Sequence, residues 1–216
     1  MIATGLLLLW SGAIPARADA VIFSNLGPGN SYGSTGRSLG DPGDGDYVTL
    51  GNAFTVGATS MNLSEIEVAA GLMRGTNQLT IDLDADSGGS PGAVIESFTI
   101  KNAMPVFGTV SMDNLVTATS VLHPLLTAGT QYWVVLSVPD DGLTWAAWNL
   151  NSTGDTGPVV ISHDGVMGDP QTITRGAMEI LGQSSVPEPS TLVMLGTSGV
   201  VLLAFGRGRR GRSKSA

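Results

Sequence analysis

The middle of this 216-residue chain consists of short runs in which apolar and polar residues alternate. Residues 78–85, QLTIDLDA, place Leu79, Ile81 and Leu83 on one side of an extended backbone and Asp82 on the other. Turn signals rich in Gly, Pro and Asp separate these runs, and no amphipathic helix of ten or more residues is evident. The pattern predicts an all-β fold, a single β-sandwich or jelly-roll-like domain over residues 21–185. Its strands are expected at 47–56, 61–69, 78–85, 93–100, 106–112, 131–138, 143–149, 159–162 and 171–181.

Residues 1–20 have the pattern of a signal peptide. The apolar run at 5–14 is too short to span a bilayer, which takes ~20 residues. Ala18 and Ala20 each complete a pair of small residues spaced two apart, so signal peptidase is expected to cut after one of them, following export through the Sec translocon. Residues 1–4 contain no Lys or Arg, which leaves open a start codon placed elsewhere, an atypical signal or a buried N-terminal helix.

Residues 186–216 combine three features in a fixed order. Pro187, Glu188 and Pro189 come first, and an apolar segment at 190–206 follows. As a helix this segment would be ~25 Å long, slightly short of a ~30 Å hydrocarbon core, and it is predicted to be one C-terminal transmembrane helix. The tail at 207–216 has no acidic residue and is expected to stay in the cytoplasm, with everything before the helix outside it. Its basic residues are Arg207, Arg209, Arg210, Arg212 and Lys214.

This order resembles the PEP-CTERM sorting signal of Gram-negative bacteria. The resemblance implies that exosortase, an integral-membrane protease-transpeptidase, recognises the chain near residues 187–189. It further implies transient insertion in the inner membrane and then transfer to the cell surface or to an extracellular exopolysaccharide matrix, as in a biofilm. The expected partners are therefore the Sec translocon, signal peptidase, exosortase and the membrane, with exopolysaccharide as a further candidate.

Three segments of the middle region resemble the choice-of-anchor domains, which are extracellular bacterial modules. These segments are DSGGSPG at 86–92, LTAGTQYWVVL at 126–136 and the strand that carries Trp145 and Trp148. The resemblance covers residues 45–150. It implies a β-sandwich and a surface location, and it supplies no catalytic residues.

The net charge of −8 divides sharply between two parts of the chain. Residues 1–206 carry 18 acidic and 5 basic residues (18 − 5 = 13 excess negative charges), whereas the tail carries five positive charges. An acidic body repels phosphate backbones, so nucleic-acid binding is excluded. The chain has no cysteine, which excludes disulfides, thiol catalysis and cysteine-ligated zinc. His123 and His163 lack a second histidine at ligand spacing, and surface or turn roles are predicted for both.

Two stretches, 29–33 and 36–40, match the nucleophile-elbow pattern G-x-S-x-G. A real elbow lies between a strand and a helix, but both matches lie in a Gly/Ser-rich loop with no helical pattern after it. The sequence also offers no convergent acid pair or triad. We therefore predict that the protein is not an enzyme and has no catalytic residue.

Asp82, Asp84 and Asp86 are spaced like the first ligands of an EF-hand calcium loop. Position 12 of such a loop would be Ala93, where a Glu is needed, and no helices flank it. Residues 41–46, DPGDGD, form a second segment rich in oxygen ligands. Two interpretations stay open: weak binding of extracellular calcium, or solvated turns and an acidic strand face. No other cofactor is expected.

Aromatic residues raise the question of a sugar ligand. Strand alternation places Tyr132 and Trp133 on opposite faces, and likewise Trp145 and Trp148, so at least half of them are expected in the core. Trp145 and Trp148 are the candidate glycan contacts. The favoured function is an exported, non-enzymatic surface or matrix protein sorted by exosortase. The alternative is a carbohydrate-binding module or an accessory to exopolysaccharide processing.

Overall fold

The computed structural model describes residues 19–108 and 114–184 of the chain. The chain divides into two compact units, Met1–Gln183 and Ser184–Ala216, and the fold described below is that of the first. The predicted transmembrane helix at 190–206 lies outside the described residues. Within those residues, no helix has the length and apolar character needed to cross a membrane.

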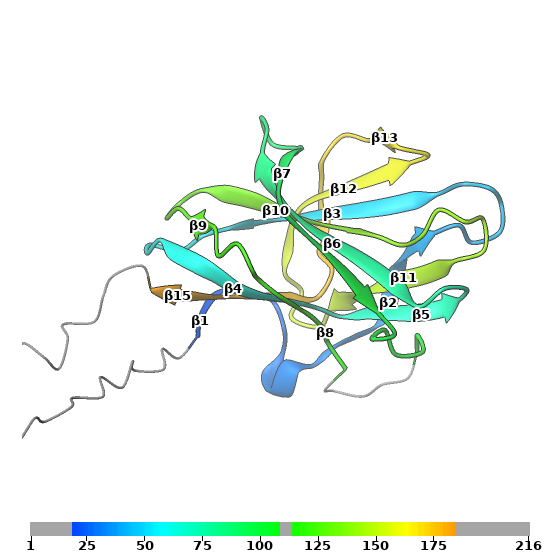
Figure 1. Ribbon diagram of the computed structural model, residues 1–216, viewed down its shortest axis with the longest axis horizontal. Coiled ribbons are helices and arrows are strands. Elements are labelled where there is room, and N and C mark those ends of the chain that lie inside the picture. Colours follow the sequence, from blue (N-terminus) through cyan, green and yellow to red (C-terminus); the bar gives the residue numbers. More distant parts are fainter. Residues whose placement is uncertain (1–18, 109–113, 185–216) are drawn as a thin grey trace, which may run out of the picture. The chain divides into compact units, whose positions relative to one another are not determined.

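The described residues form fifteen strands and one short 3-10 helix (Figure 1). In chain order the elements are β1 (Ala20–Ser24), η1 (Pro28–Asn30), β2 (Tyr32–Gly40), β3 (Val48–Thr55), β4 (Met61–Val68), β5 (Ala70–Arg74), β6 (Gln78–Asp86), β7 (Pro91–Lys101), β8 (Val116–Thr119), β9 (Leu125–Leu126), β10 (Gln131–Ser137), β11 (Trp145–Asn151), β12 (Thr156–His163), β13 (Val166–Met167), β14 (Gln171–Thr174) and β15 (Met178–Ser184). The prediction of an all-β sandwich is confirmed.

The larger sheet has ten strands in the order β5-β11-β2-β3-β10-β6-β7, with β12 also paired to β3, β13 and β14. Strand β3 pairs with β10 along one edge and with β12 along the other. At Asn52 both neighbours are present, since this residue is opposite Val134 of β10 and Val159 of β12. Both pairings are antiparallel, although β10 and β12 follow β3 only after long stretches of chain.

The smaller sheet has the order β1-β15-β4-β8, and β9 pairs with β4. Ala20 of β1 is opposite Gly182 of β15 in an antiparallel register. The beginning of β1 and the end of β15 therefore lie at the same end of the domain (Figure 1).

A ring of backbone hydrogen bonds joins the two sheets where β4 passes into β5. The Ala69 amide donates to the Ala177 carbonyl at 3.1 Å, the Ala177 amide to the Asn149 carbonyl at 2.8 Å, and the Asn149 amide to the Ala69 carbonyl at 2.8 Å. These three residues satisfy each other's backbone groups in a buried place, where an unpaired amide would be costly.

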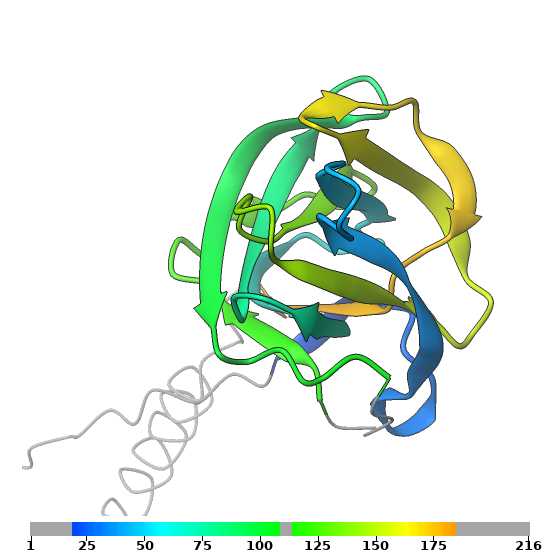
Figure 2. The same cartoon turned by 90° about the vertical axis from the view of Figure 1, so that its right-hand side faces the viewer.

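The core lies between the facing sides of the strands, which Figure 2 shows wrapped around it. Leu79, Ile81 and Leu83 of β6 are fully buried in this core, as their alternation predicted. Tyr132 and Trp148 also belong to it. Burying side chains of this size stabilises the fold by about 1.5–3 kcal/mol each.

The opposite face of the large sheet carries a second, smaller apolar cluster. It consists of Trp133, Ala53 and Val160, with Val135 packed against them. Tyr132 and Trp133 thus lie on opposite faces of β10, as predicted, yet both are buried.

Three predictions for the strands are corrected. The prediction of a strand at 106–112 is wrong for residues 106–108: Val106 forms a single parallel bridge to Leu72, and a turn follows. Residues 109–113 lie outside the described residues. The strand expected at 171–181 is divided into β14 and β15 at 175–177, where Gly176 packs against Trp148. Residues 29–40, expected as a loop, contain β2.

Candidate functional site

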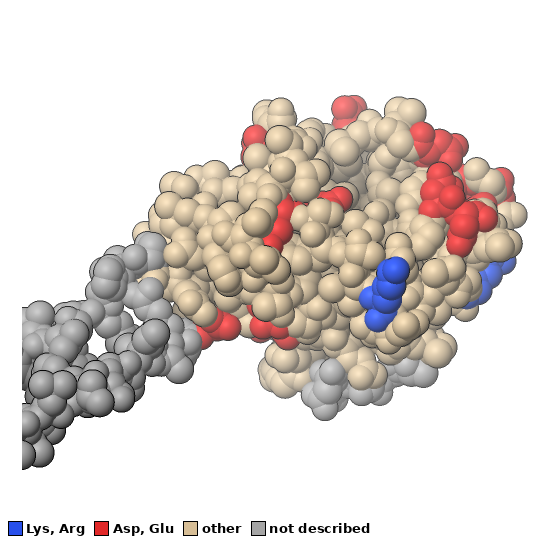
Figure 3. Space-filling model, viewed as in Figure 1, with Lys and Arg blue, Asp and Glu red and all other residues tan. Residues whose placement is uncertain are grey.

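Carboxylates dominate the charged surface of the domain (Figure 3). Among the described residues, Arg37, Arg74, Lys101 and Arg175 are the Lys and Arg side chains. Arg175 forms an ion pair, and the guanidinium carbon of Arg74 lies 5.7 Å from the ring centre of Trp145. A surface of this kind leaves most of the carboxylates without a protein counter-charge.

Asp82, Asp84 and Asp86 lie on β6, on the face opposite the main core. In the register with β10, Asp82 is opposite Val135 and Asp84 is opposite Trp133. The three aspartates therefore share the face that also carries the smaller apolar cluster.

Asp86 is engaged in contacts within the protein. Its Oδ1 accepts hydrogen bonds from Trp133 Nε1 at 2.9 Å and from Gln131 Nε2 at 2.7 Å, and its Oδ2 accepts one from the Gly89 amide at 3.1 Å. The bond from Trp133 is the main cause of a pKa below the ordinary value for Asp86. The described residues hold no group of three His, Cys, Asp or Glu that could bind a metal, so the three aspartates do not form one ligand set.

Asp84 differs from Asp86 in its burial, its hydrogen bonding and the direction of its pKa shift. Its side chain is only 6% exposed, and burial followed by the charge of Asp82 raises the pKa of Asp84 to about 6. The Oδ1 atoms of Asp82 and Asp84 are both buried and have no hydrogen-bond partner in the protein. A buried carboxylate without a hydrogen-bond donor or counter-charge costs several kcal/mol.

The two candidate glycan contacts lie on opposite faces of β11, as predicted. Trp148 is fully buried in the core and donates its Nε1 hydrogen bond to the Ala177 carbonyl at 3.0 Å. It offers no face to a sugar ring, so the choice of Trp148 as a contact is corrected. Trp145 is half-buried, with Nε1 3.3 Å from Ser38 Oγ and Arg74 over its ring.

The acidic loop at 41–46 bonds to itself and to its neighbour. Asp41 Oδ1 accepts from the amides of Gly43 and Gly45 at 2.6 and 3.2 Å, which closes the turn. Asp46 Oδ2 lies 2.7 Å from Nδ1 of the exposed His163. The surface role predicted for His163 is confirmed.

A buried glutamate that sequence reasoning missed organises the segment after β8. Glu96 Oε1 accepts from the amides of Val121 and Leu122 at 2.7 and 3.0 Å, and Oε2 accepts from Ser120 Oγ at 2.7 Å. Burial alone would raise the pKa of Glu96, but these bonds and the charge of His123 outweigh it and hold the pKa below its usual value.

One sequence signal could have identified Glu96. It is in phase with Phe98 and Ile100, the apolar side of the predicted strand at 93–100. An acid at an inward-facing position needs a set of donors. His123 belongs to the turn that Glu96 holds, as its predicted turn role required: its φ is 47° and its Nδ1 lies 3.1 Å from the Leu63 carbonyl oxygen.

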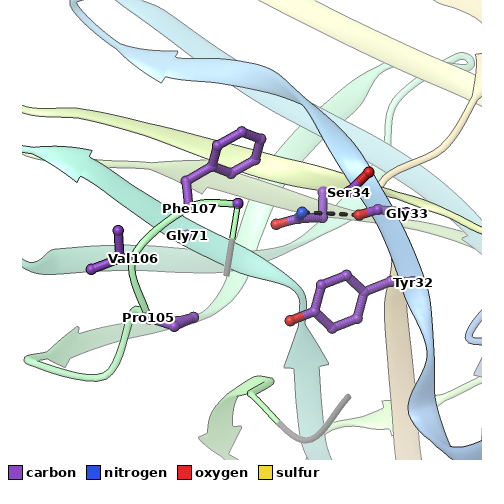
Figure 4. A pocket seen from close by; sticks show the side chains of 9 residues that line it. Tyr32, Gly33, Ser34, Gly71, Pro105, Val106 and Phe107 are labelled. Atoms are coloured by element: carbon purple, nitrogen blue, oxygen red, sulfur yellow. Dashed lines mark hydrogen bonds between the residues drawn. The ribbon is translucent and has the colours of Figure 1, made fainter. Parts of the chain in front are cut away.

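A shallow pocket lies between the start of β2 and residues 105–108 (Figure 4). Tyr32 and Phe107 flank it, with Gly71 and Asn149 also in its wall. Its volume of ≈ 10 Å³ is at the lower limit for a single water molecule and far below the few hundred Å³ of ordinary ligand sites.

Neither G-x-S-x-G match forms a nucleophile elbow. Residues 29–33 run from η1 into β2, and 36–40 lie within β2, with no helix after either. Ser38 accepts the hydrogen bond from Trp145 described above. The interpretation of these matches as chance patterns is supported by their place in the strand.

The residues predicted for processing lie at or beyond the ends of the described segment. Ala18 lies outside the described residues, and Ala20 is the first residue of β1. Pro187, Glu188, Pro189 and the basic tail lie outside the described residues as well.

Residues 185–210 match the family model of the PEP-CTERM protein-sorting motif. The match contains Pro187, Glu188 and Pro189 and reaches Arg210, so the predicted sorting signal is confirmed. This motif implies exosortase as the processing partner, export, and transient membrane association before display at the cell surface. The chain matches none of the curated proteins and no solved structure.

Proposed function

We propose that this chain is a non-enzymatic surface or matrix protein of a Gram-negative bacterium, with exosortase acting near Pro187, Glu188 and Pro189. The observation that carries the proposal is the position of the sorting motif. It begins at residue 185, directly after β15 ends at Ser184. The β-sandwich is therefore the part of the chain that remains for display once the signal has been processed.

The absence of an enzymatic role is supported by the chemistry of the described residues. The pocket between Tyr32 and Phe107 is too small for a substrate, and the serines of both G-x-S-x-G matches lack the elbow geometry. Asp41 of the acidic loop at 41–46 accepts hydrogen bonds from two backbone amides, which is a structural use of its carboxylate.

The proposed sorting is tested by cell fractionation with mass mapping of both termini. The full chain should appear at the surface or in the matrix with both ends processed. A chain lacking residues 187–216 should be released or remain periplasmic. Surface display that survives this deletion would refute the assignment. Arg212→Gln is the control: it changes a residue outside the matched motif, and the protein should still reach the surface.

The alternative, a carbohydrate-binding module, depends on Trp145, because Trp133 and Trp148 are fully buried. A sugar ring would have to displace or share the Arg74 guanidinium that lies over the Trp145 ring. Pull-down with exopolysaccharide would test it: binding that is lost in Trp145→Ala but kept in Arg37→Gln would favour this alternative over a purely structural role.

A further inference from the structure

Two carboxylates of β6 each have one buried oxygen with no hydrogen-bond partner among the described residues. Asp82 and Asp84 are two residues apart on one strand, so their side chains leave the same face of the sheet. The Asp84 residue is only 6% exposed, and the Oδ1 atoms of both residues are shielded from solvent with no hydrogen bond to any described residue. A buried carboxylate oxygen is costly unless it meets a hydrogen-bond donor or a cation.

The surroundings supply neutral oxygens but no cation. Ser97 of β7 is directly opposite Asp82, and Thr80 is two residues before it on the same face. On β10 the partners are Val135 and Trp133, which carry no charge. The nearest basic residue along β7 is Lys101, opposite Gln78 at the other end of the strand pair.

The neighbouring acids do not belong to the pair. Asp86 already accepts three hydrogen bonds, from Trp133, Gln131 and Gly89. Glu96 is opposite Leu83 on the core face and is bound to the segment 120–122.

We propose that Asp82 and Asp84 bind one calcium ion, with the hydroxyl groups of Thr80 and Ser97 and water as further oxygen ligands. Calcium suits such a set because it accepts six to eight oxygens in irregular geometry, whereas magnesium needs a near-ideal octahedron. Two carboxylates give a weak site, in the ~10⁻⁴–10⁻³ M range of extracellular modules.

The bound ion would stabilise the outer layer of the large sheet. Asp84 is opposite Trp133, and Trp133 is held by Asp86 and by Ala53 and Val160. A cation that reduces the repulsion between Asp82 and Asp84 would therefore stabilise the pairing of β6 with β10 next to this apolar cluster.

The test is thermal unfolding of the full chain in mild detergent, with and without calcium, after removal of metal by a chelator. At about ten times the dissociation constant, calcium should raise the melting temperature by about 3–5 °C. Asp82→Asn and Asp84→Asn should each abolish the rise. Asp86→Asn is the matched control, on the same strand and face, and should keep it.

Two results would overturn the proposal. One is a wild-type melting temperature that calcium leaves unchanged or that sodium chloride of equal ionic strength raises equally. The other is a calcium response that persists in Asp84→Asn. Isothermal titration calorimetry of the wild type and of Asp84→Asn gives an independent readout, since the variant should lose the heat of binding even if its melting temperature changes for other reasons.

Discussion

Arg175 and Asp155 form a bidentate ion pair at the junction between the two sheets. Arg175 Nε donates to Asp155 Oδ2 at 2.8 Å, and Nη2 donates to Oδ1 at 2.9 Å. The same guanidinium donates to the carbonyls of Ala53 and Thr156 and lies 5.0 Å over the ring of Phe23. Arg175 therefore connects β1, β3, β12 and the segment before β15, and its side chain is mostly buried.

Asp155→Asn should lower the free energy of unfolding by about 1–3 kcal/mol, because it leaves the mostly buried guanidinium without its charged partner. Urea unfolding measures the change. Asp169→Asn, in an exposed position, should stay within about 0.5 kcal/mol of the wild type. Equal effects of the two substitutions would show that the pair contributes no more than an ordinary surface charge.

Gly176→Ala should destabilise the domain by about 1–3 kcal/mol through overpacking. An added Cβ would overlap the indole ring of Trp148, which is fully buried and cannot move aside. Gly57→Ala is the control, since open space surrounds that position, and it should be neutral or slightly stabilising. Wild-type stability in Gly176→Ala would contradict the tight contact.

Glu96→Gln should loosen residues 120–122 and lower stability by about 1–3 kcal/mol at neutral pH, because two backbone amides lose a charged acceptor. The folded-state pKa of Glu96 is depressed, so its contribution is present above the ordinary pKa of about 4.3 and lost as the pH falls through the lower, folded value. The difference between variant and wild type should therefore shrink in acid.

Hydrogen exchange of the Val121 and Leu122 amides gives the local measurement, and both should exchange faster in Glu96→Gln. Glu179→Gln, a substitution on the small sheet, is the control and should leave these two amides unchanged. Unaltered exchange in Glu96→Gln would mean that the carboxylate does not hold the segment.

Asp84→Asn should change the pH dependence of stability in the opposite sense to Glu96→Gln. The folded-state pKa of Asp84 is raised to about 6, so the folded protein binds this proton more tightly than the unfolded chain does. Without calcium, the stability of the wild type relative to Asp84→Asn should fall by about 1–3 kcal/mol as the pH rises from about 4 through 6. A difference between the two proteins that stays constant or moves in favour of the wild type over this range would contradict the prediction.

Cleavage after Ala18 and cleavage after Ala20 would give mature chains that differ in the contacts at the start of β1. Ala20 pairs with Gly182, and Gln183 Nε2 donates to Asp19 Oδ1 at 3.1 Å. A chain that begins at Asp19 keeps both contacts, whereas one that begins at Val21 loses them. We expect the shorter chain to be less stable by about 0.5–1.5 kcal/mol in urea unfolding, and equal stability would show that the first two residues contribute nothing.

The alternation in 78–85 predicted β6 and its buried face correctly, because a pattern of period two is set by residues next to each other in sequence. The strand β2 was missed for the opposite reason. Its sequence, YGSTGRSLG, has little apolar character. A Cβ at Gly36 would lie 2.8 Å from the Trp148 carbonyl oxygen and 3.0 Å from the Phe107 ring, so the position favours glycine. That requirement comes from residues more than seventy positions away and leaves no local pattern.

The candidate site shows the same division between local and distant causes. The alternating pattern correctly placed Asp82, Asp84 and Asp86 on one strand and one face, since these are local properties. The sequence could not indicate that Trp133 and Gln131 would take Asp86 out of the set, because those contacts depend on the register between β6 and β10. The sorting motif was fully predictable because it is recognised as a linear sequence.

The position of β15 bears on how the domain withstands mechanical load. This strand lies between β1 and β4 in the small sheet, and its last residue, Ser184, directly precedes the sorting motif. A tether at that end, drawn along the strand, would load the hydrogen bonds to both neighbours at the same time and not one after another. Rupture under such a load requires shear of a whole strand out of the sheet.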